Sequence, residues 1–277
     1  MDSVVKNQPQ GLQVCPRDGD AQEFRCIAGP APWTGAYAFT GQEFDFPPAG
    51  RPKLLYMVAA TRRSGSTFFC RHLWQTGMLG APMEYFSLPH VMLELAPRLG
   101  ASSPYDYVNA VLARRTSANG VFGMKVMLDH LAIMRVMSVR FRTPHVIFVQ
   151  RRDSVAQAVS LAKALQTRQW NSLYPTSPQS ASYNFNHILN CLKRIRQEVN
   201  AWEGWFRENR IVPIPVYYED FTRDPEGVVG EILTRFGIAL DPVHRIPLPS
   251  VERQADSTSS QWITRFREEA AERSIGL

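Results

Sequence analysis

The stretch "YMVAATRRSGSTFF", residues 56–69, decides the fold of this chain. An apolar run stops at two arginines, a Ser-Gly-Ser-Thr sequence follows, and apolar residues then resume. This order predicts a buried strand, a tight turn and the start of a helix. Against the phosphate-binding pattern G-x-x-x-x-G-K-[ST], Gly65 and Thr67 are in register. Ala60 stands at the first glycine and Ser66 at the lysine, so the match is partial.

Strands and helices alternate from about residue 53 onward. The expected strands are 53–60, 121–127, 145–150 and 211–218. The expected helices are 66–77, 104–115, 129–139, 153–168, 183–209, 225–236 and 259–273. Continuous apolar runs suit strands that are buried on both faces, as in a parallel sheet. The sequence therefore predicts an α/β fold with a P-loop-like central parallel sheet flanked by helices.

Composition favours an ordinary soluble protein of 277 residues with one α/β domain, because 44% of the residues are hydrophobic and 20% are charged. The net charge of +6 is spread among acids, which fits an anionic substrate and argues against nucleic acid as a partner. The four cysteines form no C-x-x-C and the six histidines show no ligand spacing, so we expect no metal. We find no signal peptide and no membrane span, which predicts a cytoplasmic protein.

Residues 1–50 form a Gly/Pro/aromatic-rich extension, and residues 51–277 form the expected domain. One interpretation of the extension is a poorly structured tail. The other is an arm whose aromatic residues pack on the body of the protein or on a second subunit. These aromatic residues are Trp33, Tyr37, Phe39, Phe44 and Phe46.

The loop after the first strand is a candidate anion site. Backbone N–H groups in such a turn and the N-terminus of the following helix both attract a phosphate. Arg62 and Arg63, which directly precede Ser64 and Gly65, strengthen this expectation. The lysine that reaches the β/γ-phosphates of nucleotides is absent, and no strand ends in a convincing acidic ligand for Mg²⁺. The loop therefore predicts a phosphate-bearing ligand that is bound without a metal.

A second strand end repeats this design. The run 145–150 stops at Arg151 and Arg152, and a helix that carries Ser160 begins directly afterwards. Arginine provides permanently charged, bidentate donors to phosphate. The alternative is that these arginines pair with acids at a helix start. Two arginine-rich strand ends in one parallel sheet favour a ligand with phosphates at both ends.

With these motifs, residues 53–277 resemble the bacterial trehalose 2-sulfotransferase family, whose members use 3′-phosphoadenosine 5′-phosphosulfate (PAPS). The matching stretches are "RSGST" (63–67), "GMKVM" (123–127), "QAVS" (157–160), "LQTRQW" (165–170) and "VERQADSTSSQW" (251–262). The resemblance implies the sulfotransferase fold and transfer of a sulfuryl group from PAPS to a hydroxyl of a carbohydrate or glycosylated metabolite. It also implies a homodimer.

The resemblance assigns roles at both anion sites. The first loop would hold the 5′-phosphosulfate through Arg63, Ser64, Gly65, Ser66 and Thr67, with Arg63 beside the transferring group. The 3′-phosphate would be held by Ser160 and by Arg151 or Arg152, between which the sequence does not decide. Arg253 is expected near the 3′-phosphate or the acceptor.

Glu84, in "GAPMEYFS", matches the catalytic base of the family. The acceptor-binding candidates are Arg62, Met83, Glu84, Tyr85 and Phe86. His72, His90 and His130 are rival bases. The chain departs from the family pattern mainly around the expected acceptor site, so the acceptor stays open. Two competing hypotheses are an ATP-dependent phosphotransferase and a non-catalytic nucleotide- or sugar-binding protein.

Overall fold

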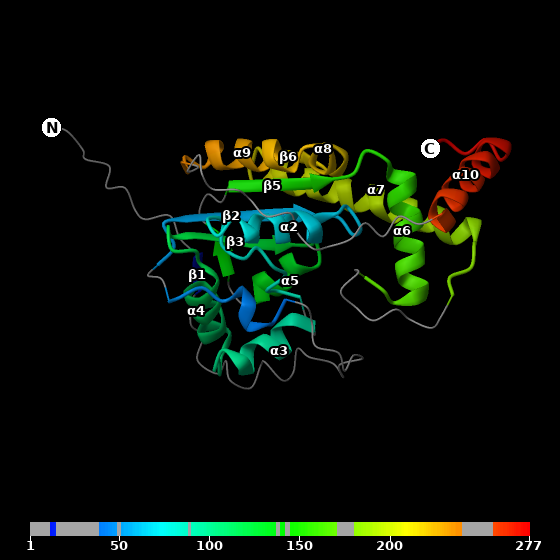
Figure 1. Ribbon diagram of the computed structural model, residues 1–277. Coiled ribbons are helices and arrows are strands. Elements are labelled where there is room, and N and C mark those ends of the chain that lie inside the picture. The colour runs from blue at the N-terminus through cyan, green and yellow to red at the C-terminus, as the bar shows by residue number, and fades with distance from the viewer. Residues whose placement is uncertain are drawn as a thin grey trace. The chain divides into compact units, whose positions relative to one another are not determined.

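The computed structural model describes residues 12–14, 39–48, 51–87, 90–136, 139–141, 145–170, 180–239 and 257–277. Its central sheet consists of β2 (Leu54–Ala60), β3 (Val121–Val126), β5 (His145–Gln150) and β6 (Ile214–Tyr217). The strand order is β3-β2-β5-β6, and the strands run in parallel (Figure 1). The predicted central parallel sheet with flanking helices is therefore confirmed.

The chain divides into two compact units. The first unit consists of residues 1–57 and 77–145, and the second unit consists of residues 58–76 and 146–277. Strand β2 contributes residues to both units. The boundary at residue 50 stays a prediction.

The first unit contains β3, α3 (His90–Arg98), α4 (Pro104–Arg115), α5 (His130–Val136) and a single 3₁₀ turn, η1 (Gln42–Phe44). It also contains a two-stranded antiparallel sheet formed by β1 (Leu12–Val14) and β4 (Val139–Phe141). This small sheet and α3 were not predicted from the sequence.

Residues 39–46 pack on the body of the first unit. Phe39 and Phe44 are buried, with their ring centroids 6.2 Å apart. Asp45 accepts hydrogen bonds of 2.8 Å from both terminal nitrogens of Arg98. Its carboxylate also lies 3.2 Å from Nε of Arg115, a side chain with no solvent exposure. This part of the extension is therefore a packed arm, while Trp33 and Tyr37 lie outside the described residues.

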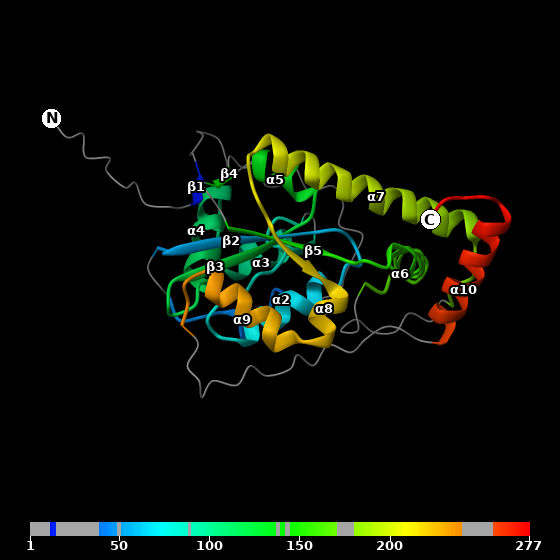
Figure 2. The same cartoon turned by 90° about the horizontal axis from the view of Figure 1, so that it is seen from above.

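In the second unit, helices cover both faces of the strands. The described helices of this unit are α2 (Ser66–Gln75), α6 (Ser154–Thr167), α7 (Phe185–Glu208), α8 (Tyr218–Arg223), α9 (Pro225–Arg235) and α10 (Ser257–Glu272). Helix α7 lies on one side and α2, α8 and α9 on the other (Figure 2). On the α7 side, Phe206 meets Phe148 of β5 at 5.2 Å. On the opposite side, Phe221 of α8 packs edge-on against Phe69 of α2 at 5.1 Å.

Strand β6 is shorter than the predicted run 211–218. Pro215 removes one backbone donor from it, which an edge strand tolerates. Helix α8 starts directly at Tyr218, so the last residue of the predicted strand is helical.

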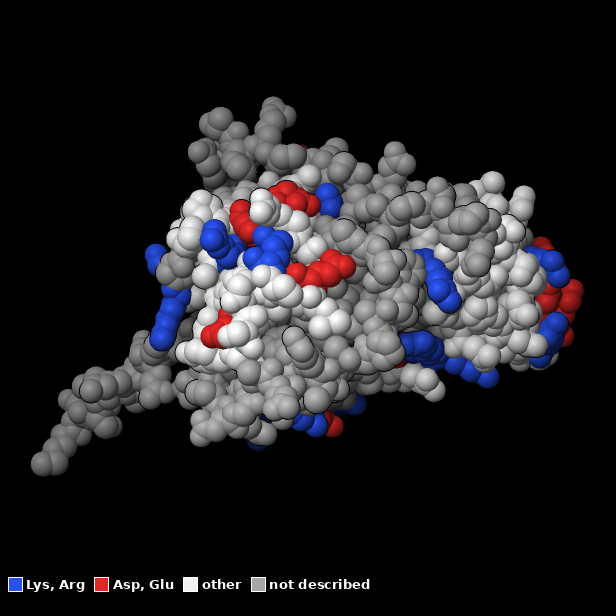
Figure 3. Space-filling model, turned by 90° about the horizontal axis from the view of Figure 1, so that it is seen from below, with Lys and Arg blue, Asp and Glu red and all other residues white. Residues whose placement is uncertain are grey.

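The described surface shows no single-sign patch on the face in Figure 3, where basic and acidic side chains are interspersed. None of the helices that the structure describes is both long and apolar enough to cross a membrane.

Candidate functional site

The turn between β2 and α2 is shaped around Gly65. This residue is the N-cap of α2 and adopts a left-handed conformation with φ of 83°. A Cβ at this position would lie 2.3 Å from a ring carbon of Tyr218, so only glycine fits. The hydroxyl of Ser64 is buried and has no hydrogen-bond partner among the described residues. A turn at a helix N-terminus with an unsatisfied buried hydroxyl is suited to an anion.

Arg63 connects the two predicted anion sites. Its Nε donates a hydrogen bond of 2.9 Å to Oγ of Ser160, and its Nη1 donates to the carbonyl of Trp170. Burial, followed by repulsion from the charge of Arg151, lowers the pKa of Arg63 to about 10. Arg63 is still protonated at neutral pH. Within the second unit, the loop, Ser160 and Arg151 therefore belong to one positively charged cluster.

Arg151 and Arg152 lie in different surroundings. The Arg151 side chain is 20% exposed, lies over the ring of Tyr218 at 5.0 Å, and has its Nε 3.8 Å from Glu219. The Arg152 side chain is 50% exposed and pairs with Asp220 at 2.5 Å. Both arginines thus lie within ion-pair distance of an acid in the first turn of α8, as the alternative interpretation of this motif held, and the pair of Arg152 is the closer one. Arg151 lies close enough to Arg63 to affect its pKa.

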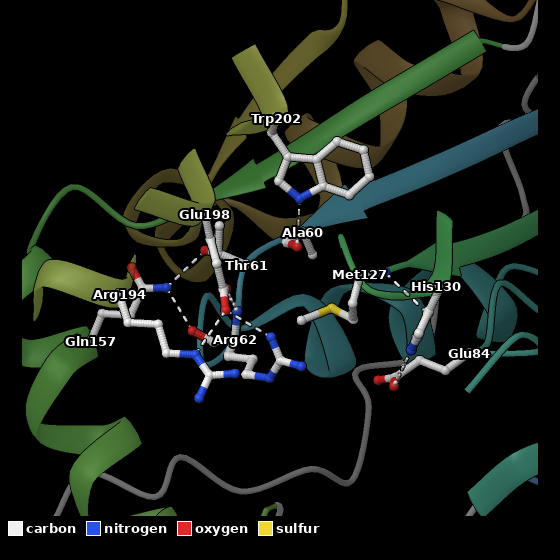
Figure 4. A network of polar contacts seen from close by, with 10 residues as sticks. All are labelled: Ala60, Thr61, Arg62, Glu84, Met127, His130, Gln157, Arg194, Glu198 and Trp202. Atoms are coloured by element: carbon white, nitrogen blue, oxygen red, sulfur yellow. Dashed lines mark hydrogen bonds and ion pairs between the residues drawn. The ribbon is translucent and has the colours of Figure 1, made fainter. Parts of the chain in front are cut away.

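Arg62 pairs with a buried carboxylate on α7. Its Nη1 donates to Oε1 of Glu198 at 2.7 Å, and the side chains of Arg62 and Glu198 are 22% and 11% exposed (Figure 4). The expectation that Arg62 contacts an acceptor stays a prediction.

Glu84, in the first unit, contacts the buried side chains of Lys125 and His130. Its Oε1 is 2.6 Å from Nζ of Lys125, and its Oε2 is 3.9 Å from Nε2 of His130. The backbone N–H of Met127 donates to Nδ1 of His130 at 3.1 Å (Figure 4). Because Nδ1 accepts this bond, the neutral imidazole carries its proton on Nε2, which is directed at Glu84.

Backbone pairing with β3 fixes the segment that carries Glu84. Met83 forms a parallel bridge with Met124, and the N–H of Lys125 donates to the carbonyl of Met83 at 2.9 Å. Met83, Tyr85 and Phe86 are at most 3% exposed, so they contribute packing around Glu84. Their contact with an acceptor stays a prediction.

The other predicted residues are placed as follows. His72 is fully buried against Phe221, and neither ring nitrogen has a hydrogen-bond partner in the described part of the chain. Burial lowers the pKa of His72, in spite of the opposing charge of Glu226, so its ring is neutral. The side chain of His90 and all of Arg253 lie outside the described residues.

Several residues that contact the predicted segments within their own unit were not predicted: Lys125 in the first unit, and Gln157, Glu198 and Trp202 in the second. Lys125 could have been identified from the sequence, since it is the one charged residue in the apolar run "VFGMKVM". The other three look like ordinary members of amphipathic helices. A search for metal ligands among the described residues finds no group of three or more His, Cys, Asp or Glu side chains.

Sequence and structure comparisons show which known proteins the chain is similar to. A family model described as Stf0 sulphotransferase matches residues 55–269. The chain is 32% identical over 257 residues to trehalose 2-sulfotransferase of Mycobacterium tuberculosis (strain ATCC 35801 / TMC 107 / Erdman), covering 78% of this chain and 95% of that protein. It is 31% identical over 259 residues to trehalose 2-sulfotransferase of Mycolicibacterium smegmatis, with the same coverage. A solved sulfotransferase domain, from the olefin synthase of Synechococcus PCC 7002, has a TM-score of 0.37 and 14% identity, covering 80% of this chain and 97% of that domain.

Proposed function

Because the chain belongs to the Stf0 sulphotransferase family, we propose that it transfers a sulfuryl group from PAPS to a hydroxyl of a carbohydrate or glycosylated metabolite. The observation that carries this proposal is the cluster of Arg63, Arg151 and Ser160 beside the unsatisfied hydroxyl of Ser64. Two guanidinium groups that repel one another are each stabilised by an anion bound beside them.

The donor is held in two places under this proposal. Arg63, Ser64, Gly65, Ser66 and Thr67 bind the 5′ end, where backbone N–H groups and the start of α2 face the phosphosulfate. Arg151 and Ser160 bind the 3′-phosphate, and the position of Arg151 beside Arg63 supports its choice over Arg152. The donor supplies the sulfuryl group, and Arg63 stabilises the charge that develops as this group moves.

Glu84 is the proposed base, which takes the proton of the acceptor hydroxyl as the new S–O bond forms. The ammonium of Lys125, 2.6 Å away, stabilises the charged form of the carboxylate. His130 is a poorer candidate, because its Nδ1 already accepts a bond from Met127 and its Nε2 bears a proton. His72 is buried without access to solvent.

The acceptor is proposed to be a sugar, and trehalose is the first candidate because the two relatives are named for it. The proposal extends to a cytoplasmic homodimer. The buried thiol of Cys191, which forms no disulfide, supports a reducing compartment, and the family resemblance supports the dimer.

Calorimetric titration with the desulfated donor product, adenosine 3′,5′-bisphosphate (PAP), tests donor binding. We expect PAP to bind without metal and more tightly than Mg-ATP. Replacing Arg151 with Gln should raise the Kd for PAP about tenfold or more, since bonds to charged groups contribute about 1.5–3 kcal/mol. The matched variant, Arg152→Gln, should change it less than about twofold, as for an exposed pair.

Other outcomes of this titration would redirect the proposal. Tighter binding of Mg-ATP than of PAP would favour the phosphotransferase hypothesis. Equal effects of the two arginine variants would remove the assignment of the 3′-phosphate to Arg151.

A further inference from the structure

The chain leaving β2 is held by three side chains from α6 and α7. These residues, which we call the loop clamp, are Gln157 of α6 and Glu198 and Trp202 of α7. All three are at most 8% exposed. Figure 4 shows them directed at the consecutive residues Ala60, Thr61 and Arg62. The donor-binding loop begins directly after this point.

Gln157 makes the most complete contact of the clamp. Its side-chain amide donates one hydrogen bond to Oγ1 of Thr61 at 2.9 Å and one to the carbonyl of Arg62 at 2.7 Å. Both amide hydrogens are therefore used on the loop. Gln157 and Thr61 are each 1% exposed, so water does not replace these bonds when they are lost.

Glu198 and Trp202 hold the neighbouring backbone groups. The indole Nε1 of Trp202 donates to the carbonyl of Ala60 at 3.0 Å. The carboxylate of Glu198 accepts from the backbone N–H of Arg62 at 3.4 Å and from its guanidinium at 2.7 Å. The clamp thus fixes main-chain groups of both Ala60 and Arg62 and the hydroxyl of Thr61.

The residue that follows the clamp has a strained backbone. Arg63 has a φ of 63°, a left-handed conformation that costs free energy for any residue other than glycine. Such a conformation persists only where surrounding contacts enforce it, and it is concentrated at binding sites. Ser160 lies on α6 about one turn after Gln157 and accepts the Nε bond of Arg63. Helix α6 therefore holds both the backbone before Arg63 and the guanidinium of Arg63 itself.

We propose that Gln157 is a positioning residue for sulfuryl transfer, which sets the loop conformation that binds the 5′ end of the donor. This inference rests on the proposed function, because it assigns a role in binding the same donor. Gln157 does not touch the donor in this scheme. It acts through Thr61 and Arg62, and Glu198 supports it from α7.

The test uses Gln157→Met, which keeps the length of the side chain and removes both hydrogen bonds. Calorimetry would measure the Kd for PAP and for adenosine 3′-phosphate, which lacks the 5′ group. In the wild type, PAP should bind more tightly than adenosine 3′-phosphate. In Gln157→Met we expect the Kd for PAP to rise about tenfold or more, and the Kd for adenosine 3′-phosphate to change less than about twofold.

Gln166→Met is the matched control, because Gln166 lies on the same helix and its side-chain amide also forms hydrogen bonds, among them one donated to the carbonyl of Ser182 and one accepted from its N–H. This control should leave the Kd values for both ligands unchanged. Equal weakening of both ligands in Gln157→Met would indicate a general structural role and overturn the inference, as would wild-type binding of PAP. If the wild type binds neither ligand, the proposed function fails and the inference fails with it.

Discussion

Replacing Glu84 and Lys125, singly and together, should separate the stability of their ion pair from its catalytic role. The side chains are 20% and 5% exposed, and the charged atoms are 2.6 Å apart. Removing one partner of such a pair leaves the other charge buried, at a cost of about 3–5 kcal/mol. For a protein of this size, about 3 kcal/mol corresponds to a fall in Tm of about 6–12 °C.

The double variant is the informative one. Glu84→Gln and Lys125→Met should each lower the Tm by this amount, because each removes the opposite charge that lies 2.6 Å from the remaining one. Glu84→Gln/Lys125→Met leaves neither charge, so its Tm should return to within about 3 °C of the wild type. Sulfuryl transfer should stay absent in the double variant, since the base is still missing. Stability would then recover without activity.

Thermal unfolding in the absence of ligand measures the change in Tm, and transfer from labelled PAPS measures the loss of activity. Glu231→Gln is the control for stability, because its partner Arg235 lies 2.8 Å away but both side chains are more than half exposed. We expect this control to cost less than about 1 kcal/mol. A double variant whose fall in Tm equals the two single falls added together would refute the coupling of Glu84 to Lys125. Normal transfer by Glu84→Gln would refute its role as the base.

Two further predictions concern the packed arm and the loop. Burial raises the pKa of Asp45, but the hydrogen bonds from Arg98 and the charge of Arg115 outweigh it, so the net pKa is lowered. The stability from this carboxylate is present above about pH 4 and is lost as the pH falls through its folded pKa. Asp45→Asn should be about 3 kcal/mol less stable than the wild type at pH 6. Between pH 6 and pH 2, denaturation followed by circular dichroism should therefore show a smaller fall in the free energy of unfolding for Asp45→Asn than for the wild type. Equal falls in the two proteins would contradict this prediction. Gly65→Ala should weaken PAP binding in calorimetry, because the added Cβ would lie 2.3 Å from the ring of Tyr218. Gly77→Ala is the control and should leave PAP binding unchanged, because nothing lies within 4 Å of its added Cβ. Equal effects of the two variants would refute the steric argument.

The sequence predicted what depends on local pattern. The 24-residue helix α7 begins and ends within two residues of the expected range 183–209, because its apolar face recurs at three and four residues. The pairing of β1 with β4 was missed, since Leu12 lies opposite Phe141, far along the chain. Helix α8 was missed because it has only six residues and follows β6 directly.

At the candidate site, residue type was readable from the sequence and side-chain direction was not. Arg151 and Arg152 are adjacent and chemically identical, and only the fold places one over the ring of Tyr218 and the other against Asp220. Gln157 is a polar residue in an apolar helix stripe, and its partner Thr61 is 96 positions away. Such contacts follow from tertiary packing rather than from local spacing.

The decisive measurement of the proposed activity is transfer of ³⁵S from labelled PAPS to trehalose and a panel of other sugars, without added metal. We expect label on a sugar hydroxyl with the wild type and none with Glu84→Gln, although that variant should still bind PAP. Absence of label on every acceptor, with phosphate transferred from labelled Mg-ATP instead, would show that the protein is not a sulfotransferase.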